Sequence, residues 1–390
     1  MHFPTDSPGL LARLASAWLP PALFALWGLE AWFTWARLRH MPNLPEPAER
    51  LPAQPVTLCI PARNEERELG PALDSWLAQD WPALRILVVD DGSSDATPAI
   101  LAERQARHPD RLRVIRNDGL PPGWLGKNHA LDLASRQPEA LDAPWLLFAD
   151  ADVQATPDLL RRAFTFLQAH PADILALLPA IDAESAAERV FMPVANMCFL
   201  WLVPARRVAD PRSLACCGVG GFILVRRGAY DAAGGHAAAP MAAVDDMLLA
   251  HRIKAAGFRN RVALGGPRLH LRMYHGAGEI VRGLRKNLLA MPWAFAAAPL
   301  LAAAVFLATL GCVVVTLAGS PGLGLLLWLL VPPLIAETHQ RFTGRGADPL
   351  WALWPLAGPL VLAALGLAFW DRLRGVNRWR GRAVKLTRTA

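Results

Sequence analysis

The sequence is poor in the residues that mark disulfide and zinc frameworks. Its 390 residues include five cysteines, and no two of them form a Cys-x-x-Cys pair. The vicinal pair of Cys216 and Cys217 suits neither a routine disulfide framework nor a zinc site, and Cys59, Cys198 and Cys312 are isolated. We therefore expect reduced cysteines in a cytoplasmic domain.

Two common nucleotide-binding signatures are also missing. No Gly-x-Gly-x-x-Gly follows a predicted strand, which argues against a dinucleotide oxidoreductase. The phosphate-loop pattern is absent, because Gly119 and Gly126 have the wrong spacing and Asn128 follows Lys127. Basic runs interleaved with aromatic residues are absent as well, so the net charge of +7 indicates a membrane surface rather than nucleic acid.

Long apolar runs, in contrast, occur at both ends of the chain. Apolar residues make up 53% of the sequence, and the mean hydropathy is +0.24. A spanning helix needs about 20 apolar residues, so we predict N-terminal and C-terminal transmembrane helices. The first run has no small-residue cleavage site and is expected to be a retained anchor. The runs are Leu14–Ala36, Ala294–Gly319, Gly322–Ala336, which Pro332 and Pro333 break, and Trp351–Trp370, with Trp at both edges.

Basic residues gather where the apolar runs meet the central part of the chain. They are Arg37, Arg39, His40, Arg282, Arg285 and Lys286. This bias is typical of a cytoplasmic face, so we expect an integral protein of a bacterial-type cell membrane with its soluble domain in the cytoplasm. If every C-terminal run spans, the basic tail lies outside, against the charge rule; the proline-broken run is therefore expected to be re-entrant or interfacial. The predicted parts are an anchor (1–45), a soluble domain (46–275), an interfacial amphipathic helix (276–293), membrane segments (294–371) and a basic tail (372–390).

Strand and helix signals alternate in the soluble part. The β-rich runs "VTLCIPA", "LRILVVD", "LRVIRN" and "PWLLFADADV" are separated by stretches with helical spacing of apolar residues. Such alternation predicts an α/β fold with a mostly parallel sheet flanked by helices, which binds ligands at the carboxyl ends of its strands.

The fourth run ends in two acids. In an extended segment, residues i and i+2 point to the same side, so Asp150 and Asp152 are predicted to face one ligand while Ala151 turns away. Paired carboxylates repel unless a cation lies between them, and Mg²⁺ or Mn²⁺ takes oxygen ligands and can bridge to a diphosphate. The alternative is a solvated turn in which an Asp caps the local backbone.

Other polar residues are predicted at the same edge of the sheet. Asp90 and Asp91 follow the second run, and Asn64 and Glu65 follow the first. A carboxylate there can accept a hydrogen bond from the N–H of a nucleotide base, although a capped turn is the alternative. Lys127 lies just before a helix, where it can bind phosphate or simply be solvated.

A later acidic pair opens a predicted helix. Asp245 and Asp246 precede the apolar positions Leu248, Leu249 and Ile253, which share one helix face. One acid is expected to cap the helix or complement its dipole. The other is then free to take a proton from an acceptor hydroxyl as general base.

These segments resemble a known family. "IPARNEE", "LVVDDGSSDAT", "GKNHAL", "ADADV", "GGFILVRR" and "VDDMLLAHRIKAAGF" are similar, in order and approximate spacing, to the motifs of family 2 glycosyltransferases, enzymes of the GT-A fold, over residues 56–261. The resemblance implies that Asp246 is the catalytic base of an inverting displacement, and that Asp150 and Asp152 bind Mg²⁺ or Mn²⁺ and the diphosphate. Asp245 stands where the family commonly has Glu. The residues implied in nucleotide-sugar binding are Pro61, Asn64, Glu65, Asp91, Lys127 and Asp150.

The Gln-x-x-Arg-Trp motif of processive polysaccharide synthases is absent, because the nearest stretch, "RGLRKN", lacks the Trp. The layout instead resembles membrane-bound members that glycosylate lipids: ceramide glucosyltransferase-like, hopanoid-associated and carotenoid glycosyltransferases. We expect transfer of one sugar, from a UDP-sugar before other donors, to a lipid hydroxyl, with Gly220, Gly221 and Asp245 on the acceptor side. The alternatives are a polyprenyl-phosphate or exopolysaccharide glycosyltransferase and, in another class, a non-catalytic membrane scaffold.

Overall fold

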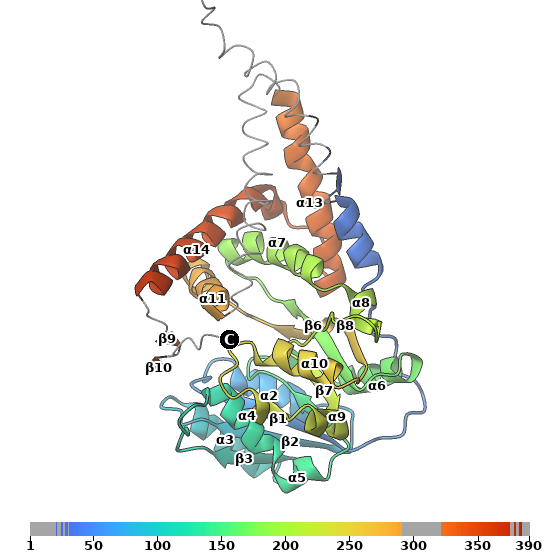
Figure 1. Cartoon of the computed structure of the whole chain (residues 1–390), viewed down its shortest axis with the longest axis vertical. Helices are drawn as coiled ribbons and strands as arrows, with labels where there is room; N and C mark the ends of the chain where they lie inside the picture. Colours follow the sequence, from blue (N-terminus) through green and yellow to red (C-terminus); the bar gives the residue numbers. More distant parts are fainter. Residues whose placement is uncertain are drawn as a thin grey trace, which may run out of the picture.

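The centre of the protein is an eight-stranded mixed sheet. The computed structural model describes residues 31–290 and 321–374, together with positions 21, 25, 28, 29, 378–379 and 382–383. The strands follow the order β3-β2-β1-β4-β7-β6-β8-β5 (Figure 1). Their bounds are β1 Val56–Ala62, β2 Leu84–Asp90, β3 Leu112–Arg116, β4 Trp145–Phe148, β5 Gln154–Ala155, β6 Ile174–Ile181, β7 Ile223–Arg226 and β8 Asn260–Leu271, with a separate pair of β9 Arg378–Trp379 and β10 Arg382–Ala383.

The sheet is parallel in its first half and mixed in its second. β1 pairs in parallel with β2 and β4, and β2 with β3, as the alternating pattern predicted. β7, however, runs antiparallel to both β4 and β6, and β5 antiparallel to β8. The reason is that the chain returns from β6 through two helices and enters β7 at the edge where β4 ends, with Ile223 opposite Phe148. The start of β7 therefore lies beside the end of β4.

Helices cover both faces of the sheet and continue beyond it. Alternating residues of β1 show the two faces: Leu58 and Ile60 are buried in one apolar cluster with α2 and α6, whereas Cys59 is buried in another with α4 and α10. The helices are α2 Leu69–Leu77, α3 Thr97–Arg107, α4 Gly126–Ser135, α5 Pro138–Leu141, α6 Leu159–Ala169, α7 Ala186–Leu202, α8 Ala205–Ala209, α9 Arg227–Ala232, α10 Asp245–Ala255, α11 Ala277–Ala290, α13 Pro321–Thr343 and α14 Ala357–Arg374, with 3₁₀ turns η1 His236–Ala238 and η2 Pro349–Leu356.

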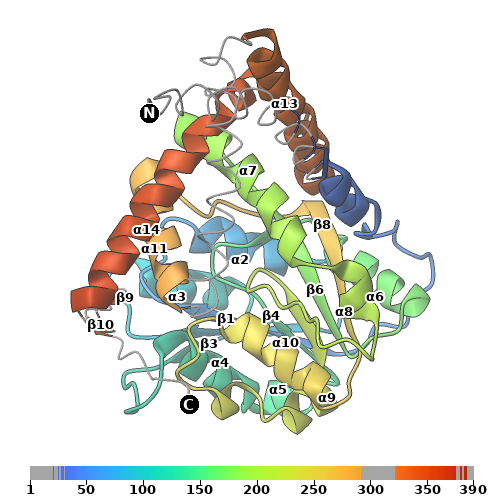
Figure 2. The ribbon, with the colours of Figure 1, turned by 45° about the horizontal axis from the view of Figure 1, so that its top comes forward.

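A third apolar cluster lies above the sheet, among α7, α11, α13 and η2. α11 lies along α14 in both views (Figures 1 and 2), with Ile280 fully buried and Arg285 paired with Asp371. The segment predicted to be an interfacial helix is thus a helix, and its apolar face packs at least partly on other parts of the chain.

The described residues contain one helical stretch long and apolar enough to cross a membrane, Pro349–Asp371. At the two edges of this run, Trp351 is 3% exposed and Trp370 is 52% exposed. The prediction of a break at Pro332 and Pro333 is wrong, because α13 continues through both. The run Ala294–Gly319 and most of Leu14–Ala36 lie outside the described residues.

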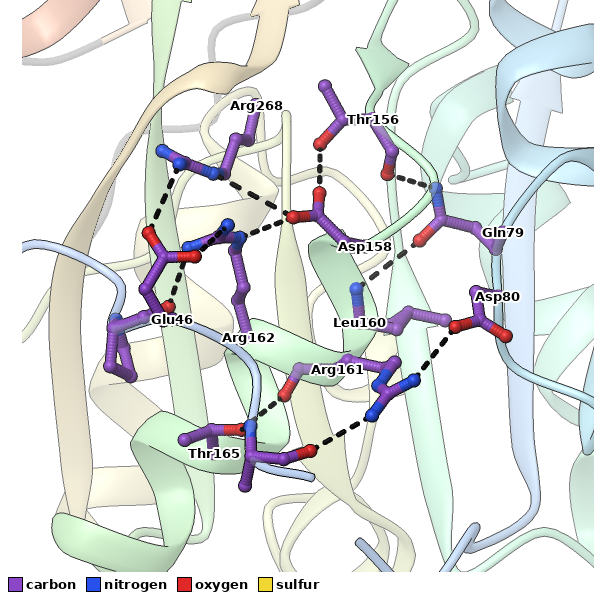
Figure 3. Close-up of polar contacts among 12 residues, drawn as sticks. Glu46, Gln79, Asp80, Thr156, Asp158, Leu160, Arg161, Arg162, Thr165 and Arg268 are labelled. Carbon is purple, nitrogen blue, oxygen red and sulfur yellow. Dashed lines mark hydrogen bonds and ion pairs between the residues drawn. The ribbon is translucent and has the colours of Figure 1, made fainter. Parts of the chain in front are cut away.

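A polar cluster fixes the segment before β1 onto α6 (Figure 3). The buried guanidinium of Arg162 donates to Asp158 Oδ2 at 2.6 Å, to Pro45 O at 2.9 Å and to Glu46 Oε2 at 2.5 Å. Arg268 of β8 lies 3.6 Å from Glu46 Oε1, so the segment is held against α6 and β8 together.

Candidate active site at the strand ends

One acid from the loop after β4 and one from the start of α10 lie beside the same lysine. Lys127 Nζ, in the first turn of α4, lies 2.7 Å from Asp150 Oδ1 and 3.5 Å from Asp245 Oδ2. Burial disfavours the ammonium, but the carboxylates of Asp150 and Asp245 outweigh it and hold the pKa of Lys127 above its ordinary value. Lys127 is therefore a permanent positive charge within an acidic group.

The structure corrects the expected geometry of the paired acids. β4 ends at Phe148, and Asp150 and Asp152 lie in the loop and turn that follow, so the i, i+2 rule for extended chain does not apply to them. The two acids still interact electrostatically, because burial, then the charges of Asp150 and Glu65, raise the pKa of Asp152. Glu65, which follows β1, thus adds a third carboxylate to the same region.

Gly220 joins the two acidic groups through its backbone. Its N–H donates to Asp246 Oδ2 at 2.8 Å, and its carbonyl accepts the N–H of Asp150 at 3.0 Å. A Cβ at this position would lie 2.5 Å from Asp150 Oδ2 and 3.1 Å from Lys127 Nζ, so any side chain here would displace these two groups. Gly221 packs instead against Pro179, where a Cβ would lie 3.2 Å from Cγ. The glycine loop before β7 therefore lines the acids rather than standing apart from them.

Asp246 is oriented by two backbone donors. Besides Gly220, the N–H of Met247 donates to its Oδ1 at 2.7 Å. Burial and the neighbouring charge of Asp245 raise the pKa of Asp246 to about 6. A fixed carboxylate with this pKa is ionised at neutral pH and basic enough to accept a proton.

The ends of β1 and β2 are tied together beside these acids. Asn64 is the one described non-glycine residue with a positive φ, 54°; its N–H donates to Ser93 Oγ at 3.0 Å and its Oδ1 accepts the N–H of Ser94 at 2.9 Å. The N–H of Glu65 donates to Thr97 Oγ1 at 2.8 Å. These bonds use the turn residues after β2 as caps, as the alternative interpretation of that turn anticipated. Pro61 lies in β1 beside Val89, half-buried.

Asp91 is anchored at the end of β2 and is 5% exposed. Its Oδ1 accepts from Asn117 Nδ2 at 2.7 Å, and its Oδ2 lies 3.4 Å from the guanidinium of Arg63. These contacts hold the Asp91 carboxylate in place at the end of β2. The neighbouring Asp90 is a turn residue, whose Oδ1 accepts the N–H of Ser93 at 2.9 Å.

Asn128, which follows Lys127, was not among the predicted site residues. Its side chain is 1% exposed, and its Nδ2 lies within hydrogen-bond distance of three carbonyls: Ala239 at 3.1 Å, Pro240 at 3.1 Å and Ala242 at 2.9 Å. These carbonyls belong to the loop that leads into α10 and Asp246. The only sequence signal was an amide side chain next to the predicted phosphate lysine, because the contacts join positions more than 100 residues apart.

We predict that Asn128→Ala lowers kcat about tenfold while leaving nucleotide affinity nearly unchanged, because the loop that positions Asp246 loses its donor. Unpaired buried carbonyls should also lower stability by about 1–3 kcal/mol. Steady-state kinetics and thermal unfolding would test this. Asn196→Ala is the matched control, since Asn196 is also buried and its Nδ2 has no partner in the described part of the chain. Equal kinetic effects in the two variants would contradict a positioning role.

Gly220→Ala should lower transfer by roughly 100-fold, because the added methyl displaces Asp150 and Lys127 from their present positions. Gly228→Ala, in α9, is the control, since a Cβ there meets nothing within 4 Å. Initial rates of both purified variants would be compared at saturating donor. Wild-type rates in Gly220→Ala would show that the close contact with Asp150 is unimportant.

The segment that carries most of these site residues is similar to a known protein family. Residues 57–233 match the family model described as Glycosyl transferase family 2. The chain carries a family 2 glycosyltransferase domain. The matched segment contains the ends of β1, β2 and β4 and the glycine loop, and it stops before Asp246.

Relatives of the glycosyltransferase domain include two curated proteins. The beta-monoglucosyldiacylglycerol synthase of Synechocystis sp. is 30% identical over 192 residues, which is 44% of this chain and 38% of that protein. A succinoglycan biosynthesis protein of Rhizobium meliloti is 35% identical over 140 residues, 35% of this chain and 36% of that protein. The chain thus matches well under half the length of each.

Among solved structures, a mannosyltransferase from Pyrobaculum calidifontis, in complex with GDP-Man and Mn²⁺, is similar to nearly the whole chain. The likeness covers 93% of this chain and 99% of that chain, with a TM-score of 0.55 and 19% identity. It confirms the α/β, GT-A-like fold.

Proposed function

We propose that the protein is an inverting, metal-dependent glycosyltransferase that moves one sugar from a nucleotide-sugar donor, UDP-sugars before others, to a hydroxyl group of a membrane lipid. The family 2 domain supports the reaction class. The diacylglycerol-based product in the name of the Synechocystis relative supports a lipid acceptor. The apolar stretch Pro349–Asp371 and the apolar runs at both ends of the sequence support a membrane setting. The proposal keeps the division into domains that was predicted from the sequence.

One observation carries this proposal: Gly220 connects Asp246 to Asp150 through its own N–H and carbonyl. A single displacement at a sugar carbon needs a base on the acceptor side and charge stabilisation on the leaving-group side. The link through Gly220 supports the assignment of Asp246 to the first role and of the region around Asp150 to the second. A second carboxylate acting as nucleophile is not needed for inversion.

In the proposed reaction, the acceptor oxygen attacks the anomeric carbon while its proton passes to Asp246. The bond from that carbon to the diphosphate oxygen breaks, and the nucleoside diphosphate leaves with both electrons of the bond. Lys127, held by Asp150, supplies positive charge near the departing phosphates. Asp91 accepts a hydrogen bond from the nucleotide base, and the loops fixed by Asn64 and Glu65 shape the space around it.

Asp150 and Asp152 fit a divalent ion whose remaining ligands come from the phosphates of the substrate. In the described residues no group of three or more His, Cys, Asp or Glu side chains could hold a metal ion. Mg²⁺, however, commonly binds through one or two carboxylates plus substrate phosphates, which is what Asp150 and Asp152 offer. Burial, then the charges of Asp150 and Glu65, raise the pKa of Asp152, and a cation bound there would favour its ionised form. When bound, the ion would neutralise the charge that develops on the diphosphate.

The second candidate function is transfer to a growing exopolysaccharide, which the name of the Rhizobium meliloti relative favours. The absence of the Gln-x-x-Arg-Trp motif weighs against a processive version of it.

The test of the proposal is a calorimetric titration of the full chain in detergent with UDP and GDP, with Mn²⁺ and then with EDTA, followed by transfer assays with lipid and glycan acceptors. Metal-dependent binding and transfer to lipid are expected. Failure to bind any nucleoside diphosphate would favour the non-catalytic scaffold. Binding with transfer only to glycans would favour the exopolysaccharide alternative.

The pH dependence of kcat gives an independent prediction. Since the pKa of Asp246 is raised to about 6, the base is protonated below that pH, and kcat should fall roughly tenfold per pH unit there and level off above pH 7. Asp245→Asn removes the neighbouring negative charge, lowers the pKa of Asp246 and should move the acid limb to lower pH. An unshifted limb in Asp245→Asn would assign the titration to another group.

A further inference from the structure

Two segments far apart in sequence form one surface at the side of the molecule away from β3 and α3. Residues 31–39 are helical, and in both views this helix lies beside α8 and the lower end of α13 (Figures 1 and 2). Leu38 and Val208 are buried in the same apolar cluster. Trp201 Nε1 at the end of α7 donates to Thr34 Oγ1 at 2.8 Å, which fixes the register of the two segments.

The polar side chains on this surface are nearly all basic. Arg39, His40, Arg206 and Arg207 are exposed, and Arg37 is half-buried. No ion pair joins any of the five to a carboxylate in the described part of the chain, whereas most other arginines of the domain have one. Burial and then the charges of Arg206 and Arg39 lower the pKa of His40, which shows that the two segments bring like charges together. Such a group is unfavourable unless an anion binds to it.

Exposed aromatic and aliphatic side chains border the charges. Trp32 is 60% exposed, Trp35 52% and Leu202 49%. The guanidinium of Arg39 lies 5.2 Å from the centre of the Trp35 ring, so one of the basic groups is in direct contact with an exposed aromatic ring. Tryptophan beside arginine is typical of the headgroup region of a bilayer, where the ring is partly apolar and the cation meets phosphate.

We propose that this surface binds the phosphate headgroups of anionic phospholipids at the bilayer face. We call it the basic-aromatic surface, and it consists of Trp32, Trp35, Arg37, Arg39, His40, Leu202, Arg206 and Arg207. The inference rests on the proposed membrane setting and adds to it a preference for negatively charged lipid and the residues that supply it.

Hydrogen bonds connect the basic-aromatic surface to α10, the helix that carries Asp246. Lys254 of α10 donates from its Nζ to the carbonyls of Arg207 at 3.1 Å, Val208 at 2.7 Å and Ala215 at 2.5 Å. Lipid bound at α8 therefore sets the position of α10 relative to the bilayer. A lipid acceptor would approach Asp246 from that bilayer.

The experiment measures which lipids stay with the protein. The full chain is purified in mixed micelles that contain equal amounts of phosphatidylglycerol and phosphatidylcholine, and the retained lipids are quantified by mass spectrometry. The wild type should retain phosphatidylglycerol in excess. In the double variant Arg206→Glu with Arg207→Glu, the ratio of retained phosphatidylglycerol to phosphatidylcholine should fall roughly tenfold. The corresponding double Gln variant should show a smaller fall. In the wild type, 0.5 M NaCl should also lower this ratio.

The matched control is Arg85→Glu with Arg107→Glu, two exposed arginines on β2 and α3 at the opposite end of the molecule, which should keep the wild-type preference. Thermal unfolding and UDP binding are recorded for every variant. Equal lipid ratios in the wild type and the Arg206 and Arg207 variant would overturn the proposal, as would a wild type with no preference. Because UDP binding does not depend on this surface, its loss in all samples would instead count against the proposed function.

Discussion

Asp246→Asn is expected to lower kcat by about 10³-fold while the affinity for nucleoside diphosphate stays within a factor of about three. Asparagine has nearly the same shape and can still accept the N–H groups of Gly220 and Met247 at its amide oxygen. It cannot take a proton from the acceptor hydroxyl. The measurements are single-turnover transfer rates at saturating donor and calorimetric binding of UDP.

Asp245→Asn is the control for this prediction. Asp245 is the neighbouring residue, lies in the same first turn of α10 and also carries a charge close to Lys127. If general base catalysis belongs to Asp246, Asp245→Asn should keep transfer within about tenfold and change mainly the pH profile. A larger loss in Asp245→Asn than in Asp246→Asn would exchange their roles.

The parallel half of the fold was accessible from the sequence because its signals are local. Apolar β-rich runs that end in polar residues predicted β1, β2 and β4, and parallel pairing by itself brings Asn64, Asp91 and Asp150 to one edge. No pairwise contact had to be known for this step. The general location of the candidate site follows from the pattern alone.

The finer geometry was not accessible, because it depends on contacts that no local pattern encodes. The end of β4 at Phe148 is set where its pairing with β1 and β7 stops, so the two acids lie in a turn rather than in extended chain. β7 is antiparallel because of the path the chain takes after β6, and only that path brings Gly220 between Asp150 and Asp246. The glycines were predicted to allow close approach, but not to which groups.

Asp152→Asn should weaken metal-dependent binding of nucleoside diphosphate by about 100-fold, and transfer should fall in parallel. The substitution keeps an oxygen ligand and removes a negative charge from a position where burial, then the charges of Asp150 and Glu65, raise the pKa of the carboxyl. Binding measured in EDTA should not weaken, since that charge repels the diphosphate when no cation is present. Calorimetry with and without Mn²⁺ separates the two contributions.

Asp150→Asn should differ from Asp152→Asn in a way that tests the role of Lys127. Asp150 also pairs with Lys127 at 2.7 Å, so its neutralisation both removes a metal ligand and releases the ammonium. Metal-dependent binding should fall as in Asp152→Asn, but binding in EDTA should rise, because Lys127 is then free to contact the diphosphate. Combining Asp150→Asn with Lys127→Met should abolish that rise. If binding in EDTA is the same in Asp152→Asn, in Asp150→Asn and in Asp150→Asn combined with Lys127→Met, then Lys127 does not contact the nucleotide. Its role is then to hold Asp150 and Asp245 together.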